Sequence, residues 1–529
     1  MLFTALPARS ILAALALPLI IAGCAGTRDI APHAQRLEVS ALDAGAAIRA
    51  ADVDAQWPTA DWWRAYGDGQ LDAWIEAAQA GSPTLALAQA RVREANAMAG
   101  VAQATLLPQL GGQMAINRQH WANNVYYGPA FLADTTTWDN TAAIGLSYHL
   151  DLWGKDKNAV ERALDNAHAR AADERAARLE LEVNIVRAYI DLSKNYALFD
   201  IATAMLAEQR KILGYAQRRL QGGLGTQLEV TQAETPLPEY ERQIDAFREA
   251  IALNKNQLAA LAGKGPGAGD AIARPHLAIS APMELPSSLP ADLIGHRPDV
   301  VAARWMVAAQ ARGVDVARAG FYPDINLLAT LGGFAAAGPL FQFLRAANGG
   351  WTAGPALSLP IFDGGRLRSE LGAAAAGYDE AVEQYNQTII GALKDVSDAI
   401  VRLRSLATQD EEARRSVSVA QRNFDLSEEG YRRGLTDYLN VLIAQTQLLQ
   451  AQQAVARITA GRLGAHASLV AALGGGAIDA TASPKEADQL PAHGKDKSLL
   501  PPMPAAWLAP VVPDSDTRKT GAPAAVGTQ

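Results

Sequence analysis

Two stretches of the chain carry hydrophobic side chains at heptad spacing over a great length. They run from about Lys155 to Leu220 and from about Arg366 to Arg433, and neither contains a proline. At about 1.5 Å per residue, each stretch predicts a helix on the order of 100 Å long. The recurring positions of the first stretch are Leu192, Phe199, Leu206, Leu213 and Leu220, with Ala188, Ala202 and Ala216 in the same heptads. A heptad sustained this far predicts a coiled-coil seam, and helices of this length favour a tube or spacer over a compact bundle.

Shorter segments between the helical patterns alternate hydrophobic and polar side chains with a period of two. This period is typical of strands with one apolar and one polar face. Clear alternation covers residues 141–152, 324–331 and 352–361, and a weaker match covers Leu110 to Trp121. Each segment has about the 9–11 residues that a tilted membrane strand needs. The sequence therefore predicts four membrane strands.

The chain matches itself when it is shifted by about 211–215 residues. Pro83 and Pro298 open corresponding helices, and Pro108 and Pro323 follow their ends, as helix geometry favours. The heptad also recurs in the second half, where Asp410 interrupts it. Its hydrophobic positions there are Leu403, Val417, Phe424 and Tyr431. Each half thus predicts a helix, two strands, a very long helix, a turn and a returning helix.

Glycine-bearing turns end both long helices. The first contains Gly223 and the second Gly434, and Thr226 and Thr436 are the candidate N-caps of the returning helices. Pro236 and Pro238 fall inside the first returning helix, where we expect a kink or a short break.

The predicted fold class is α+β. No segment after the N-terminal region has about 18 uninterrupted apolar residues, so a membrane-crossing part must be closed β-structure. Four strands cannot close a barrel, and open strand edges cannot face lipid. We therefore predict a homotrimer, with about 12 strands in an outer membrane barrel continued by a helical barrel.

The N-terminus has the pattern of a lipoprotein signal. An apolar run from Ile11 to Ile21 leads to Cys24, the single cysteine of the chain, which excludes an internal disulfide. Small residues before Cys24 form a lipobox, so we predict covalent lipid on Cys24. Ala25 follows it and points to the outer membrane. The alternative is a cleaved signal peptide that contains a cysteine by chance.

These patterns divide the chain into six predicted parts. They are a signal peptide over 1–23, a lipid-anchored segment over 24–55, a first repeat over 56–265, an inter-repeat linker over 266–290, a second repeat over 291–475, and a disordered tail over 476–529. The tail is rich in Pro, Ala, Asp and Lys without periodicity.

Three stretches resemble the outer membrane factor family, the TolC-like efflux proteins, and within it the lipoprotein branch. The first is the run from Trp62 to Leu71. The second consists of Leu285 to Leu289, His296 to Asp299 and Phe321 to Pro323. The third is the run from Tyr431 to Gln445. The last falls where the repeat independently places a hairpin tip. The resemblance covers about Trp57 to Gly475. It implies a periplasmic adaptor protein and an inner-membrane pump, of the resistance-nodulation-division type, as partners, and contact with outer membrane lipid.

Composition and motifs exclude several other function classes. A net charge of −8 with mixed signs does not predict a nucleic-acid partner. The eight histidines are scattered without a His-Glu-x-x-His pattern, and Gly263-Lys264 lacks the rest of a phosphate-binding loop. We therefore expect no enzyme activity, no metal and no cofactor besides the lipid.

The hairpin tips are the predicted periplasmic gate. Members of the resembled family commonly carry a ring of aspartates there, whereas this chain has Asn440 and Ile443 at the matching positions, beside Leu439. The first half has Glu229 and Gln232. A hydrophobic constriction resists ions by dewetting, so we hypothesise a seal by Leu439 and Ile443 with Glu229 as a remaining charge. The alternative is that both residues only pack the coiled coil.

Small residues at the tips suggest a second role. Gly223 and Gly434 end the helices, and we hypothesise that they also leave grooves for the hairpin of the adaptor. Arg219, Arg432 and Arg433 are the candidate hydrogen-bond donors to that partner.

The sequence predicts a passive small-molecule efflux duct. Two alternatives remain open: the exit duct of a type I protein secretion system, which the lipobox disfavours, and a structural lipoprotein that tethers the outer membrane, which predicts no amphipathic strands.

Overall fold

The computed structural model describes residues 29–38, 42–43, 45–49, 57–122, 132–278, 296–335 and 338–476. All of them belong to one compact unit, residues 1–484. The predicted lipid site Cys24, and residues 477–529 of the predicted tail, lie outside these ranges.

The two halves repeat one order of elements. The first half contains α4 (Pro83–Ala104), β1 (Gln109–His120), β2 (Thr136–His149), α5 (Lys155–Gln221), α6 (Gln227–Glu234) and α7 (Leu237–Leu261). The second contains α10 (Pro298–Ala319), β3 (Asp324–Ala335), β4 (Gly349–Ser358), α11 (Arg366–Arg432) and α12 (Tyr438–Ala472). The smaller elements are α2 (Gly45–Arg49), η2 (Trp62–Tyr66), α3 (Gly69–Gly81), α8 (Gly267–Asp270), η5 (Gln342–Leu344) and η6 (Ala346–Asn348). The two-copy prediction is confirmed.

The long helices α5 and α11 each span 67 residues, as the heptads predicted. The prolines act as expected, because α6 ends at Glu234 and α7 begins at Leu237, whereas α12 continues without a break. The described helices do not include one with the length and apolar content needed to cross a membrane.

The described part of the predicted linker packs against the first repeat. Gly269, in the short helix α8, approaches α7 so closely that a Cβ there would lie 2.6 Å from the carbonyl oxygen of Lys255. Further on, the Ala278 amide donates to the Tyr66 carbonyl over 3.1 Å. A glycine at position 269 therefore serves close packing as well as a turn.

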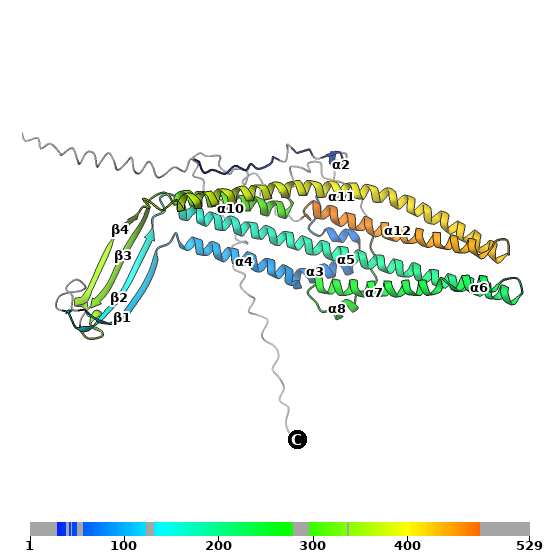
Figure 1. Ribbon diagram of the computed structural model, residues 1–529, viewed down its shortest axis with the longest axis horizontal. Helices are drawn as coiled ribbons and strands as arrows, with labels where there is room; N and C mark the ends of the chain where they lie inside the picture. Colours follow the sequence, from blue (N-terminus) through cyan, green and yellow to red (C-terminus); the bar gives the residue numbers. More distant parts are fainter. Residues whose placement is uncertain are drawn as a thin grey trace, which may run out of the picture. The chain divides into compact units, whose positions relative to one another are not determined.

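The four strands form one antiparallel sheet in the order β1-β2-β3-β4. It lies at one end of the helices, with the α5–α6 and α11–α12 turns at the other (Figure 1). β1 is a full strand despite its weak alternation, because all its residues pair with β2, from Gln109↔Ser147 to His120↔Thr136. Hydrogen bonding between the backbones of β1 and β2 thus forms a strand that the glycines and polar side chains of β1 do not predict.

The register gives the sheet one apolar and one polar face. Pairs such as Ile144↔Leu331 and Leu331↔Trp351 place large hydrophobic side chains side by side. The apolar face includes Leu110, Met114, Ile144, Leu146, Leu331, Trp351 and Leu357, all of them exposed. The opposite face carries Gln113, Thr141, Ser147, Asn326, Thr330 and Thr352. An exposed apolar face of this size predicts contact with a membrane.

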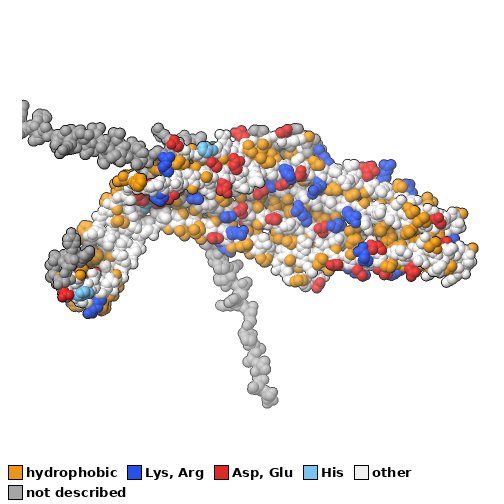
Figure 2. Space-filling view, in the orientation of Figure 1, with side chains coloured by type: hydrophobic (Ala, Val, Ile, Leu, Met, Phe, Trp, Pro, Cys, Tyr) orange, Lys and Arg blue, Asp and Glu red, His pale blue; other side chains and the backbone are white. Residues whose placement is uncertain are grey.

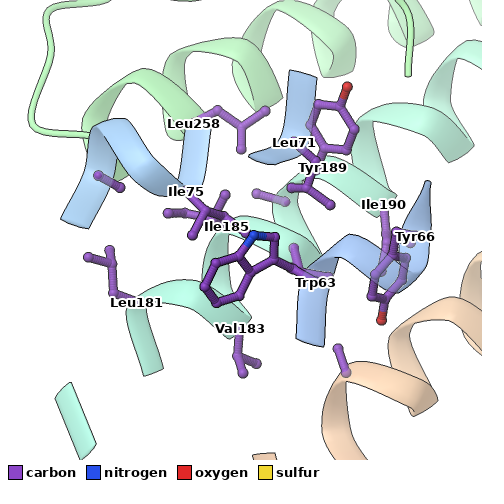
Figure 3. Packing of buried hydrophobic residues seen from close by; sticks show 14 of the residues in the cluster. Trp63, Tyr66, Leu71, Ile75, Leu181, Val183, Ile185, Tyr189, Ile190 and Leu258 are labelled. Carbon is purple, nitrogen blue, oxygen red and sulfur yellow. The ribbon is translucent and has the colours of Figure 1, made fainter. Parts of the chain in front are cut away.

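A compact core holds the middle of the helices together. Trp63 and Tyr66 from η2, with Leu71 and Ile75 from α3, pack against α5 (Figure 3). Tyr66 is fully buried, and its hydroxyl donates to the Leu463 carbonyl over 2.9 Å. Burial of each large side chain contributes about 1.5–3 kcal/mol. This cluster therefore fixes the returning helices α7 and α12 against the long helix α5.

The predicted heptad seam is buried in part, since Leu192 and Leu206 are buried whereas Phe199, Leu213 and Leu220 are half-buried. Ala202, Ala216 and Leu192 are inaccessible, and Leu206 is 7% exposed. Asp410, the interruption in the second seam, is only 6% exposed. Its Oδ2 accepts from Arg414 over 2.9 Å and from Arg462 of α12 over 2.7 Å. A carboxylate is tolerated inside the seam because two guanidinium groups compensate its charge.

The N-terminal segment lies along α11. Asp379 accepts from the amides of His33 and Ala34, each over 2.9 Å, and Asn386 accepts from the Leu37 amide over 2.8 Å. Further along, Ile48 of α2 is buried in the cluster that contains the α11 residues from Val396 to Ile400. Residue numbers rise together on both segments, so this strap, the described residues 29–38, 42–43 and 45–49, runs from the sheet end of α11 toward its hairpin end.

Candidate functional site: the helical hairpin tips

The turn after α5 is closed by its own backbone. Gly223 has φ +71°, and its amide donates to the Leu220 carbonyl over 3.0 Å. The Leu224 amide donates to the Arg219 carbonyl over 2.8 Å. This is a Schellman motif, in which a left-handed residue lets the last carbonyls of the helix find donors. The Thr226 hydroxyl then accepts from the Glu229 amide over 3.3 Å, so the predicted N-cap of α6 is confirmed.

The turn after α11 repeats this geometry. Gly434 has φ +76°, its amide donates to Tyr431, and the Leu435 amide donates to Gly430 over 2.8 Å. The predicted N-cap Thr436 is wrong, because Asp437 occupies that position and accepts from the Asn440 amide over 3.3 Å. α12 thus begins one residue later than expected, at a carboxylate that caps better than threonine.

One cluster joins the two tips. The Arg219 guanidinium, on α5, lies 5.2 Å from the ring centre of Tyr431 on α11, and its Nε lies 3.8 Å from Glu229 Oε2. The Tyr431 hydroxyl donates to the same Glu229 oxygen over 3.3 Å. A Cβ at Gly434 would lie 3.5 Å from Arg219 Nη1, so a side chain there would meet the guanidinium. We call Arg219, Glu229 and Tyr431 the tip cluster.

Burial and the neighbouring Glu229 raise the pKa of Tyr431 to about 12. Its hydroxyl therefore stays protonated at neutral pH and remains a donor to the carboxylate. Because Glu229 also faces Arg219, its charge is compensated inside the chain.

A second contact below the tip cluster links the same hairpins. Gln209 of α5 is fully buried, and its Nε2 donates to the Ala233 carbonyl over 2.5 Å and to the Tyr438 hydroxyl over 2.8 Å. Tyr438 in turn meets Tyr431 edge to face at 5.8 Å. Sequence reasoning did not single out Gln209 or Tyr438 as functional, since these two residues lie 229 positions apart.

The predicted gate residues differ in their surroundings. Leu439 is 53% exposed and Ile443 46% exposed, so within one chain neither is packed away. Asn440 lies beside them, but its Nδ2 donates to Thr436 over 2.7 Å and to Asp437 over 3.0 Å, which stabilises the start of α12. Gln232 is half-buried.

The predicted adaptor-contact residues fall into two groups. A Cβ at Gly223 would meet open space. Arg432 and Arg433 are exposed and both pair with Glu429. Arg219, by contrast, is only 25% exposed at its side chain and also donates to the Leu224 carbonyl over 3.1 Å. The first group is open at the surface, whereas Arg219 holds the two hairpins together.

In the ranges that the structure describes, no three His, Cys, Asp or Glu side chains come together in a way that could hold a metal ion. The arrangement supports contact and movement between helices.

Comparison with known proteins finds relatives that share this architecture. The profile of the outer membrane efflux protein family matches residues 74–264 and 289–475, one segment in each repeat. The fusaric acid resistance protein FusA of Burkholderia cepacia is 67% identical over 366 residues, 69% of each chain. The multidrug resistance outer membrane protein MdtP of Escherichia coli K12 is 30% identical over 469 residues, 86% of this chain and 94% of that protein.

A solved structure shares the fold. The outer membrane protein VceC of Vibrio cholerae aligns with a TM-score of 0.75 and 34% identity, over 79% of this chain and all of that one. The family match in both repeats agrees with the paired helical hairpins and the four-stranded amphipathic sheet. The chain belongs to the outer membrane efflux protein family.

Proposed function

We propose that this chain is one of three identical subunits of a passive duct that conducts small molecules across the outer membrane. The supporting observation is the amphipathic sheet continued by two 67-residue helices. In the part of the chain that the structure describes, β1 and β4 each pair on one side only. Their free edges need partner strands in a membrane, and three copies would supply a closed set of about 12.

The duct would act with a periplasmic adaptor and an inner-membrane pump. Family and fold are those of outer membrane channel proteins, so in this proposal the pump supplies the energy for transport. The relatives are named for fusaric acid resistance and multidrug resistance. We infer small organic molecules as cargo and a pump of the resistance-nodulation-division type.

The gate would be formed by the hairpin tips. Leu439 and Ile443 are exposed within one chain and are therefore available to meet their copies around a threefold axis. Apolar rings exclude ions by dewetting. The tip cluster would hold the first-half hairpin against the second, because Arg219 contacts residues of both. The Arg219–Glu229 pair is long, at 3.8 Å, and one quarter exposed at both side chains, so it can separate at a modest cost when the tips open.

The first prediction tests export. Deletion of the gene should raise the intracellular accumulation of a fluorescent dye and of fusaric acid, and the intact gene should restore export. Accumulation is measured by fluorescence and mass spectrometry. If exported proteins vanish from the medium while accumulation is unchanged, the protein-secretion duct is correct. If only membrane attachment suffers, the tether is correct.

The second prediction tests the gate. Leu439→Ala and Ile443→Ala should each raise single-channel conductance in planar bilayers, by roughly twofold or more, because the smaller side chain widens the apolar constriction and a wider constriction is wetted more easily. Arg219→Gln should raise the frequency of opening by loosening the tip cluster. Leu253→Ala, which removes a side chain of α7 that is 58% exposed, is the matched control. Unchanged conductance in both alanine variants would remove the apolar seal.

The third prediction tests the adaptor surface. Cysteine at Gly223 or Gly434 should crosslink to the adaptor in cells, since these turns lie at the helix ends. Gly372→Cys is the control, because a Cβ there meets open space as it does at Gly223, but Gly372 lies near the sheet end of α11. Equal crosslinking at all three positions, or none at the tips of stable trimers, would contradict a tip contact.

The fourth prediction tests the lipid on Cys24, which we propose as the anchor. Radioactive palmitate should label the wild-type chain and not Cys24→Ser. The strap on α11 would hold the anchored segment in place. Label on the serine variant would show that the lipid is attached elsewhere.

A further inference from the structure

The two places where the sheet passes into the long helices share one design. The β2–α5 connection contains Trp153, Lys155 and Lys157, and the β4–α11 connection contains Phe362, Arg366 and Arg368. In each, a large aromatic side chain precedes two cations spaced two residues apart. We call these six residues the junction belt. The tips and the tip cluster lie at the other end of the helices, so the belt belongs to neither gate nor adaptor surface.

The aromatic part of the belt is exposed and held in place. Phe362 is 88% exposed and Trp153 47% exposed. The Trp153 indole donates to the Pro323 carbonyl over 2.7 Å and stacks on Tyr322, with ring centres 4.8 Å apart. An amphipathic ring fixed at the surface is typical of a membrane–water interface.

The belt continues the apolar face of the sheet. Leu357, near the end of β4, is 69% exposed, and Leu359 and Ile361 continue the exposed run up to Phe362. Hydrophobic and cationic side chains lie next to each other where the sheet meets the helices (Figure 2). The surface therefore changes from apolar to positive in the direction that leads out of a bilayer.

The cations of the belt reach outward. The Lys157 and Arg366 side chains are 73% and 59% exposed, and Lys155 and Arg368 are exposed as well. Lys157 lies 3.8 Å from Glu161, which also pairs with Arg312 over 3.0 Å, and Arg366 pairs with Glu370 over 2.7 Å.

Other carboxylates of the junction are bound by backbone amides or by a histidine. Asp363 accepts from the amides of Gly365 and Leu367 over 3.0 and 2.9 Å. Asp151 accepts from the Lys157 amide over 2.8 Å, and Asp156 pairs with His149. These acids stabilise the turns and helix starts, and the Asp156 and Glu161 side chains are only 17% and 14% exposed, so the belt cations are the more accessible charges.

We propose that the junction belt binds the headgroups of anionic phospholipids in the membrane leaflet on the helix side. The aromatic rings lie at headgroup depth, and the lysine and arginine side chains extend their apolar stems along the acyl boundary to meet phosphate. The proposal rests on the membrane-facing sheet. The belt is continuous with that apolar face, and this favours a lipid over a soluble anion as the ligand. A soluble anion would make no use of the exposed Phe362 side chain.

The fifth prediction measures lipid selectivity of the full-length protein in bilayers. Spin-labelled phosphatidylglycerol and phosphatidylcholine are compared in the boundary layer of the reconstituted protein. The wild type should prefer the anionic lipid by roughly threefold at low ionic strength. Salt at about 0.5 M should remove most of the preference, because exposed charges are screened. Changing Lys155, Lys157, Arg366 and Arg368 together to Gln should abolish it.

A matched variant controls for total charge. Changing Arg210, Lys211, Arg242 and Arg248 to Gln removes four exposed cations from α5 and α7, away from the sheet, and should leave the preference unchanged. Heat-resistant trimer on gels checks folding, and the pair Lys155→Gln/Lys157→Gln serves if the quadruple variant fails that check.

Three outcomes would overturn the proposal: no preference in the wild type, a preference that survives removal of the belt cations, or a preference that millimolar inorganic phosphate abolishes at constant ionic strength. The assay needs only folded protein in a bilayer. If the export proposal is wrong, the accumulation experiment will show it, and the lipid-selectivity result can still be interpreted.

Discussion

The backbone groups on the free edges of β1 and β4 are the constraint on which the rest of the molecule depends. Each edge presents unpaired N–H and C=O groups over 12 and 10 residues, and in lipid each unpaired group costs several kcal/mol. No rearrangement of side chains can remove that cost. The cost of unpaired edges explains why a chain with four strands in its described sheet is suited to be one sector of an oligomer. It also explains why β1, despite its weak alternation, is kept in register by twelve pairs with β2.

The helices meet a different demand, because they must stay together over a great length. The middle is fixed by fully buried residues such as Tyr66 and Leu192, which pack the returning helices onto α5. A second buried cluster, which includes Ile212, Tyr438 and Val441, joins the two hairpins below their tips. Only at the turns themselves do the contacts become polar and partly exposed, as in the Arg219–Glu229 pair. Partly exposed ion pairs contribute less than buried apolar contacts, so the least strongly held part of the hairpins is the last turn.

Sequence reasoning found what depends on local periodicity. The heptads located both long helices, the prolines located the break between α6 and α7, and the shift between halves located the repeat. It missed what depends on the lateral packing of distant segments. The contact of Arg219 with Tyr431 joins residues 212 positions apart, and no spacing rule connects them. For the same reason Arg219 looked like a free donor for a partner, although it is engaged within the chain. The cap of α12 was misplaced by one residue, because Thr436 and Asp437 are both competent caps and only the backbone path chooses between them.

The strap and the sheet together limit where a lipid on Cys24 could insert. The strap begins to pair with α11 at Asp379, 13 residues after Arg366, which corresponds to about 20 Å of helix. Cys24 and His33 are nine positions apart, which corresponds to at most about 30 Å of extended chain. The chain before the strap is therefore long enough to bring an acyl group to the level of the junction belt, with little length to spare. An anchor at that level and a positive belt around the same leaflet would together oppose displacement of the duct along the membrane normal. The anchor would resist movement out of the membrane, because its acyl chains would have to leave the bilayer. The belt would resist movement into the membrane, because its charges would have to be buried.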